Sequence, residues 1–216
     1  MGFGAVVKRL AARVAPNAVV VGGQIEGANA VALTFDDGPH PTVTPQILDV
    51  LDAQQVRATF FLQGDLADRN RGIVREIVRR GHQIGNHGYA HLDARKVSTE
   101  SYVSDALRCQ SILEEITGIE LPRNFRPPFG RVAIRSTLAL LSQKFRFVFW
   151  SIDSQDSFLP DANSLVRHIQ SQRVPPGSII LFHDDYAHTA EALPRILTEF
   201  RQRELKILLL DELRLT

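Results

Sequence analysis

Short apolar runs alternate along the chain with longer segments of helical periodicity, and this alternation limits the folds open to it. Between the strand-like runs, apolar residues recur every three or four positions. The strand-like runs are residues 31–35, 58–62, 83–85, 145–152, 178–182 and 206–210. The helical segments are residues 45–54, 72–80, 99–117 and 190–203. Roughly seven βα units predict a parallel sheet with helices outside it, either as a barrel or as an open doubly wound sheet.

The chain of 216 residues is long enough for one domain with a sizeable core, and no linker or low-complexity segment divides it. We expect residues 1–29 to be an N-terminal extension or capping segment of a domain spanning residues 30–216. Lys8, Arg9 and Arg13 interrupt the N-terminal apolar runs before a signal-peptide core can form, which predicts a cytoplasmic chain. No apolar run approaches the roughly 20 residues of a membrane span, so no integral membrane segment is expected.

Charge and cysteine content argue against several classes of function. Lys and Arg number 25 against 24 Asp and Glu, a formal net charge of +1, so nothing favours a nucleic-acid partner. The single cysteine, Cys109, excludes an internal disulfide framework and a cysteine-rich zinc site. The chain has no G-x-S-x-G motif and no phosphate-binding P-loop, so serine-hydrolase and P-loop mechanisms have no candidate residues. The oligomeric state stays unknown at this level.

Reactive side chains gather where the predicted strands end. Five strand ends each carry an acid, a histidine or an arginine: Asp36 with Asp37, His87 with His91, Arg126, Asp153 with Asp156, and His183 with Asp184. The carboxyl ends of parallel strands form the active face of α/β folds, so these groups are expected to converge on one mouth. This convergence predicts an enzyme.

Two of the histidines have a spacing that suits a metal ion. His87 and His91 are four residues apart, which places both imidazoles on one face of a helical turn. A catalytic zinc site needs a third protein ligand and an open position, and a strand-end aspartate can supply that ligand. Alternatives stay open: a rival cluster comprises His183, Asp184, Asp185 and His188, and the TFDDGP segment could be turn chemistry alone. Of the other three histidines, His40 has no partner at ligand spacing, and His82 and His168 are expected to be exposed and without a role.

Taken together, five motifs make the chain resemble a known family. They are TFDDG at 34–38, HGYAH at 87–91, RPPFG at 126–130, DSQD at 153–156 and LFH at 181–183. In order and spacing they resemble the polysaccharide deacetylase family (NodB homology, carbohydrate esterase family four) from Val31 onward. The resemblance implies an α/β fold, an irregular (β/α) barrel with about seven parallel strands in a single domain, with residues 30–216 as the catalytic domain. It also implies metal-dependent hydrolysis of the acetamide of N-acetylglucosamine units in an oligo- or polysaccharide, with release of acetate.

The resemblance also implies a metal site and a base. Asp37, His87 and His91 would bind a divalent metal, most often Zn²⁺, and leave one position open. Asp36 would be the general base that deprotonates the attacking water. Arg126 would hold Asp36 in place and ionised.

A proton donor and an oxyanion site are implied as well. His183 would protonate the departing amine, with Asp156 orienting its ring. The backbone N–H of Phe129 would stabilise the oxyanion together with the metal. Asp153 would order its loop. Such a set suits amide hydrolysis, which needs a polarised carbonyl, an activated water and a proton donor.

Two positions depart from the family pattern. Gly88 stands where a serine or threonine hydroxyl usually steadies the motif loop, and Ser157 stands where a tryptophan usually forms a wall of the acyl pocket. Phe158 is expected to replace this wall. The departures keep two alternatives open: an O-acetyl esterase or cyclic-amide hydrolase with the same metal site, and a non-catalytic carbohydrate-binding homologue.

Overall fold

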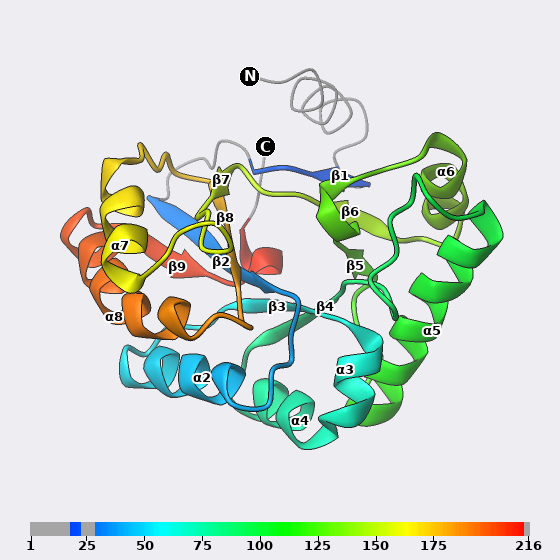
Figure 1. Cartoon of the computed structure of the whole chain (residues 1–216), viewed down its shortest axis with the longest axis horizontal. Coiled ribbons are helices and arrows are strands. Elements are labelled where there is room, and N and C mark those ends of the chain that lie inside the picture. The colour runs from blue at the N-terminus through cyan, green and yellow to red at the C-terminus, as the bar shows by residue number, and fades with distance from the viewer. Residues whose placement is uncertain (1–17, 23–28, 214–216) are drawn as a thin grey trace.

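The centre of the molecule is a curled sheet of parallel strands (Figure 1). The computed structural model describes residues 18–22 and 29–213, and in this part of the chain the strand order is β1-β6-β5-β4-β3-β2-β8-β7, with β9 also paired to β2. The strands are β1 (Val19–Val20), β2 (Ala30–Asp36), β3 (Thr59–Leu62), β4 (Gln83–Asn86), β5 (Asn124–Phe125), β6 (Arg146–Val148), β7 (Ile152–Asp153), β8 (Ile179–His183) and β9 (Lys206–Leu208). The expected parallel sheet of an irregular (β/α) barrel is therefore present.

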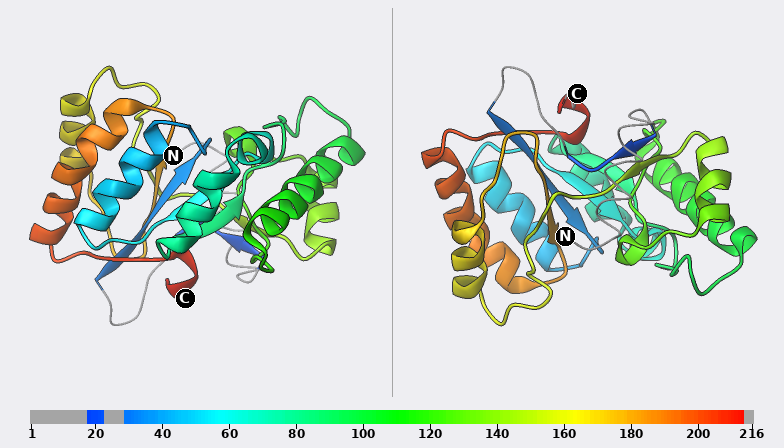
Figure 2. Two further views of the ribbon diagram at one scale, coloured as in Figure 1. Left: turned by 90° about the horizontal axis from the view of Figure 1, so that it is seen from below. Right: turned by 90° about the horizontal axis from the view of Figure 1, so that it is seen from above.

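Helices cover the outer side of this sheet (Figures 1 and 2). Neighbouring helices pack on one another around the outside, α7 on α8, α8 on α2, and α3 and α4 on α5. Of the described helices, none is long and apolar enough to cross a bilayer. They are α2 (Val43–Ala53), α3 (Gly64–Arg69), α4 (Arg71–Arg79), α5 (Thr99–Thr117), α6 (Ile134–Ser142), α7 (Ala162–Ser171) and α8 (Ala187–Gln202), with short 3₁₀ turns η1 (Pro128–Gly130) and η2 (Leu210–Glu212).

The run 145–152, which was expected to be one strand, forms two strands in different parts of the sheet. Strand β6 pairs with β1 and β5, whereas β7 pairs with β8 at the far end of the strand order. The expectation was wrong because both strands are short and the residues between them are largely apolar, so an unbroken apolar run does not reveal the break. Val19 and Val20, expected to lie in the N-terminal extension, form the edge strand β1. Residues 1–17 and 23–28 of the expected N-terminal extension lie outside the described residues.

Strand β2 is buried along its whole length and pairs with three neighbouring strands. All seven of its residues are buried, and it pairs with β3, β8 and β9. Phe35 is in register with Phe60 and Phe182, and its ring stacks on theirs with centroid distances of 5.0 and 5.7 Å. Stacked aromatic pairs across neighbouring strands add to the stabilisation from burial alone. One residue further on, Asp36 is in register with His183 of β8.

His82 contradicts the expectation that it is exposed. It lies directly before β4, its side chain is buried, and its Nδ1 accepts a hydrogen bond of 3.2 Å from the Ala58 N–H. Its ring packs edge-on against Phe60. Burial lowers the pKa of His82 from its usual 6.5 to about 4, because the charged imidazolium loses its hydration.

The buried His82 makes stability depend on pH. The unfolded chain protonates this imidazole below about pH 6.5, whereas the folded chain holds it neutral down to about pH 4. Its contribution to the free energy of unfolding is therefore present above pH 6.5 and is lost as the pH falls toward 4. In His82→Asn, where the amide oxygen replaces Nδ1 as acceptor, we expect urea denaturation to show a smaller loss of stability over this window than the unchanged chain. Equal losses of stability in the two proteins would contradict the assignment of this pH dependence to His82.

Candidate active site

Parallel register brings the predicted strand ends to one edge of the sheet. Asp36 pairs with Phe61 of β3 and with His183 of β8, Leu62 pairs with Asn86 of β4, and Asn86 pairs with Phe125 of β5. The residues that directly follow these strands therefore lie near one another at the carboxyl edge: Asp37, Gln63, His87 and Arg126. This is the edge at which α/β folds place their active sites.

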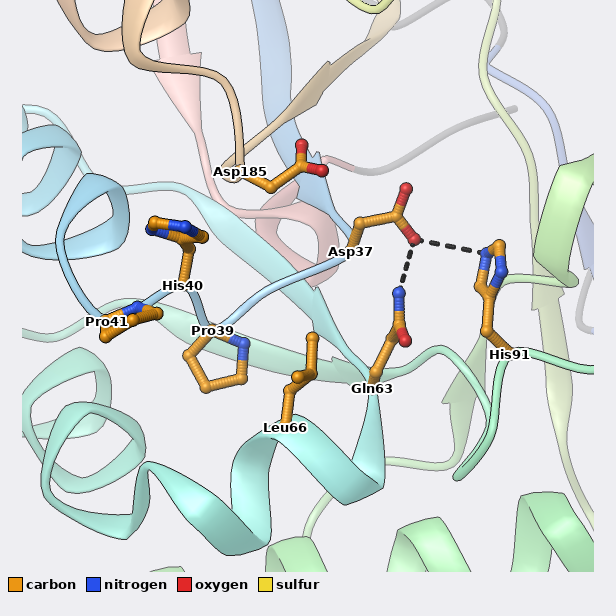
Figure 3. Close-up of a pocket in the computed structure, with 8 residues that line it drawn as sticks. All are labelled: Asp37, Pro39, His40, Pro41, Gln63, Leu66, His91 and Asp185. Atoms are coloured by element: carbon orange, nitrogen blue, oxygen red, sulfur yellow. Dashed lines mark hydrogen bonds and ion pairs between the residues drawn. The ribbon is translucent and has the colours of Figure 1, made fainter.

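Asp37, His87 and His91 form a group with the geometry of a metal site. One ligand atom from each residue lies within 4.8 Å of the others. Asp37 Oδ1 is 3.1 Å from His91 Nε2 and 3.6 Å from His87 Nε2. Figure 3 shows the Asp37 carboxylate and the His91 ring directed at each other. One carboxylate and two imidazoles are donors that suit zinc and similar divalent cations, so these residues fit such an ion.

The two histidines converge through a bend, so the expected helical turn is wrong. The segment after β4 has no helical hydrogen bonding, and Gly88 and His91 have φ angles of 79° and 52°. A left-handed residue at position 88 interrupts a helical turn, and the four-residue spacing of the histidines does not indicate such an interruption. The bend still brings the two imidazole rings together, with 5.0 Å between their centroids.

Asp105 of α5 holds this bend in place. Its carboxylate accepts hydrogen bonds from the backbone N–H groups of Tyr89 (2.8 Å) and Ala90 (2.9 Å). A Cβ at position 88 would lie 2.7 Å from Asp105 Oδ2, and the φ of Gly88 is left-handed, so glycine suits this position. A helix carboxylate therefore steadies the loop at a site without the usual hydroxyl. The role of Asp105 is not visible in the sequence, because nothing in its local pattern indicates a bond to a loop fifteen residues away.

A buried backbone contact orients His87 toward Asp37. The Nδ1 of His87 lies 2.7 Å from the Arg126 carbonyl oxygen, which can only accept, so Nδ1 carries the proton and Nε2 presents its lone pair to the site. Burial lowers the pKa of His87, which favours this neutral form.

Asp37 is held as a carboxylate. Burial alone would raise its pKa, but the hydrogen bond with His91 and the nearby imidazoles of His87 and His183 outweigh burial and hold the pKa well below its usual range. Its φ of 75° is left-handed, which turns its side chain out of the β2 pleat. Asp36 and Asp37 thus reach the same mouth although they are adjacent.

Arg126 and Asp36 form a buried ion pair beside the histidines. Arg126 is fully buried, and its Nη1 donates to Asp36 Oδ1 and to the Thr34 hydroxyl, both at 2.7 Å. Its guanidinium carbon also lies 4.1 Å from the centre of the Phe61 ring. The second oxygen of Asp36 points toward the site, 3.8 Å from His87 Nε2. Arg126 thus fixes one oxygen of Asp36 and leaves the other directed at the site.

His183 and Asp156 form a second oriented pair. Asp156 Oδ1 lies 2.7 Å from His183 Nδ1, and its Oδ2 accepts from the His183 N–H and the Thr189 hydroxyl. Burial lowers the pKa of His183, but Asp156, Asp36 and Asp37 outweigh it and raise the value to about 9. The free Nε2 lies 3.9 Å from Asp37 Oδ2. His183 therefore presents a protonated nitrogen to the site.

The rival cluster around His183 does not assemble in the described residues. His188 Nε2 bonds the Asp156 carbonyl at 2.8 Å, and Asp184 accepts from the Thr44 hydroxyl at 2.6 Å. Asp153 accepts a bond from the Gln155 N–H within its own loop.

Two aromatic residues near the mouth differ in their contacts. The Phe129 ring lies 4.5 Å from the His91 ring, and its φ of 58° is left-handed. Phe158, expected to form a wall of the acyl pocket, is 84% exposed, and its part in such a wall stays a prediction.

A pocket of about 270 Å³ opens beside Asp37 and His91 (Figure 3). Its other lining residues are Pro39, His40, Pro41, Gln63, Leu66 and Asp185.

Loss of Arg126 is expected to destabilise the fold. Arg126→Met leaves the Asp36 carboxylate buried without its counter-charge, which should lower the free energy of unfolding by roughly 3–5 kcal/mol. Urea denaturation of the metal-free protein measures this loss. Arg79→Met, which breaks an exposed pair with Glu76, is the matched control and is expected to change stability little. Equal effects of the two substitutions would contradict the account.

Comparison with known proteins places this chain in a family. The family model described as polysaccharide deacetylase matches residues 24–148. Two proteins of Bacillus cereus, both named peptidoglycan-N-acetylglucosamine deacetylase, are 35% identical over 80% and 85% of this chain, which spans 64% and 87% of their lengths. A chitooligosaccharide deacetylase of Bradyrhizobium sp. is 33% identical over 76% of this chain and 74% of its own.

Solved structures show the same fold. A peptidoglycan N-acetylglucosamine deacetylase superposes with a TM-score of 0.86 at 32% identity, over 94% of this chain and 95% of its own. A protein of Bacillus anthracis described as a CE4 family pseudoenzyme superposes with a TM-score of 0.82 at 25% identity, over 92% of this chain and 69% of its own. With the family model and the relatives in agreement, the chain belongs to the polysaccharide deacetylase family.

Proposed function

We propose that this chain hydrolyses the acetamide of N-acetylglucosamine units in an oligo- or polysaccharide and releases acetate, with a divalent cation, most favourably Zn²⁺, as cofactor. The observation that carries the proposal is the convergence of three ligand atoms, from Asp37, His87 and His91, within 4.8 Å of one another. The relatives named for acetylated saccharides support the choice of substrate.

Asp37, His87 and His91 would hold the cation. When bound, it would supply Lewis-acid polarisation of the acetamide carbonyl and would make the attacking water more acidic. The neutral Nε2 of His87 and the ionised Asp37 are in the protonation states that metal ligands require.

Asp36 is suited to take the proton of the attacking water. Its Oδ1 is fixed by Arg126, so its Oδ2, directed toward His87, is the oxygen available as a base. Arg126 has no freedom to leave, because it is fully buried and also bonded to Thr34. A base held in one orientation next to the attacked carbon needs little reorganisation when the reaction occurs.

His183 is suited to protonate the departing amine. As the C–N bond breaks, the amine nitrogen needs a proton, and His183 carries one on Nε2 while Asp156 accepts from Nδ1. The backbone N–H of Phe129, a residue whose ring packs against His91, is the proposed donor to the developing oxyanion.

The substrate could instead be an O-acetyl ester with the same machinery. Ser157 provides no large apolar side chain next to Asp156, and the neighbouring Phe158 is exposed, so these two residues do not select between an acetamide and an acetyl ester. Acetate release from chitooligosaccharides and from acetylated xylan, measured side by side with one enzyme preparation, separates the two substrates. Faster release from xylan would overturn the N-acetyl assignment and keep the metal site.

The metal dependence is tested by analysing metal content and acetate release together. We expect Asp37→Ala and His87→Ala to lose both the bound cation and turnover of chitooligosaccharides, because two ligands do not hold the ion. Asp49→Ala, an exposed aspartate on α2, is the control and should keep both. Full activity in a chelated, metal-free sample would refute the mechanism. Absence of turnover in a fully metal-loaded sample with every acetylated glycan would instead favour a non-catalytic homologue.

Substitution of His183, the proposed proton donor, should lower the rate of turnover without changing metal binding. In His183→Gln the side chain can still bond Asp156 but cannot deliver a proton, so kcat is expected to fall by roughly 10²–10⁴-fold. Metal content should stay at that of the unchanged chain, because His183 is not among the three proposed ligands. Wild-type kcat in this variant would remove His183 from the mechanism.

A further inference from the structure

The end of strand β3 places Gln63 against the proposed metal ligand Asp37. Gln63 directly follows Leu62, the last residue of β3, and has an extended backbone with φ −77° and ψ 130°. Its backbone N–H donates to the Gly38 carbonyl at 2.9 Å. Because Gly38 is the neighbour of Asp37, this bond ties the backbone of Gln63 to the loop that carries the ligand. The side chain therefore starts from a fixed point beside Asp37.

The side chain of Gln63 is directed into the site. Gln63 occupies the N-cap position of α3, but its side chain makes no capping hydrogen bond to that helix. Instead, its Nε2 donates to Asp37 Oδ1 at 2.8 Å (Figure 3). This is the oxygen that lies 3.1 Å from His91 Nε2 and 3.6 Å from His87 Nε2. The amide thus bonds the carboxylate oxygen that meets both imidazoles.

Asp37 depends on such a partner more than an ordinary strand residue would. Its backbone is left-handed, with φ 75°, so the regular pleat of β2 does not direct its side chain. The carboxylate also borders an open pocket, so no packed side chains restrict its torsions on that side. A hydrogen bond from a partner with a fixed backbone restricts those torsions and keeps Oδ1 facing the histidines.

We propose that Gln63 is a positioning residue that holds Asp37 Oδ1 in the orientation for binding a divalent cation, and so sets the affinity of the Asp37–His87–His91 site. The inference rests on the proposed function, since it requires that Asp37 be a ligand. An amide suits this task because it donates a hydrogen bond without adding charge. A glutamate of the same shape would place a second negative charge against Asp37 and could not donate when ionised.

The test is a titration of the metal-free full chain with Zn²⁺ in competition with a chromophoric chelator. Gln63→Met keeps the length of the side chain and removes the donor, and it is expected to weaken Zn²⁺ binding by roughly 10–100-fold. Gln170→Met is the matched control, because Gln170 also donates its amide to a carboxylate, that of Glu199, but on the exposed outer face of α7. Its Zn²⁺ affinity should be that of the unchanged chain.

Kinetics at two metal concentrations distinguish positioning from other roles. At limiting Zn²⁺ Gln63→Met should have a low kcat, and saturating Zn²⁺ should restore most of it with the saccharide KM unchanged. Unchanged Zn²⁺ affinity with a raised KM would mean that Gln63 contacts substrate. Unchanged affinity with a lowered thermal midpoint of the metal-free protein would mean a structural role. Either result overturns the proposal.

Two further measurements test the proposal if Gln63→Met does not fold, and separate it from the proposed metal site. If Gln63→Met does not fold, the side-chain amide resonance of Gln63 in the unchanged chain is followed by NMR during the Zn²⁺ titration. That resonance must shift as its acceptor becomes a ligand, and an unshifted resonance overturns the proposal. Asp37→Ala is titrated in parallel. Wild-type affinity in Asp37→Ala would refute the proposed metal site itself, whereas loss there with full affinity in Gln63→Met refutes only the role of Gln63.

Discussion

In-register pairing of β2 with β3 and β8 is the constraint on which the site depends. It sets Asp36 level with Phe61 and His183, so the residues that follow these strands meet at one edge of the sheet. The stacked rings of Phe35, Phe60 and Phe182 lie one residue below and are fully buried. A shift of one residue in either pairing would turn the buried aromatic rings to the other face of the sheet, and it would also move the site residues out of line. The packing of the core therefore also fixes the positions of the site residues.

Left-handed backbone conformations then direct several side chains toward the site. Asp37, His91 and Phe129 all have left-handed φ angles, which are uncommon for residues other than glycine. Such conformations persist only where surrounding contacts hold them. In this chain those contacts come from Gln63 on Asp37 and from Asp105 on the loop that precedes His91. Gln63, between β3 and α3, and Asp105 of α5 thus stabilise a loop geometry that the strands alone do not determine.

Much of the fold followed from patterns that are local in sequence. Helix α5 has the predicted bounds, because its Ser98 cap, apolar spacing and terminal Gly118 agree. Strands β6 and β7 could not be told apart in the sequence, since both lie in one largely apolar run that does not show the break between them. The reactive residues could be found from the sequence, because α/β folds place their active-site residues directly after the carboxyl ends of the strands. Gln63 and Asp105 were not, because their roles arise from contacts between segments distant in sequence.

The central claim is that Asp37, His87 and His91 bind one cation together. X-ray absorption spectroscopy of the Zn²⁺-loaded chain tests it most directly. The account predicts two imidazole nitrogens and additional oxygen ligands at about 2.0–2.2 Å, with one imidazole lost in His91→Ala. A spectrum without imidazole scattering, or one that His91→Ala leaves unchanged, would show that the ion is held elsewhere and would contradict the account.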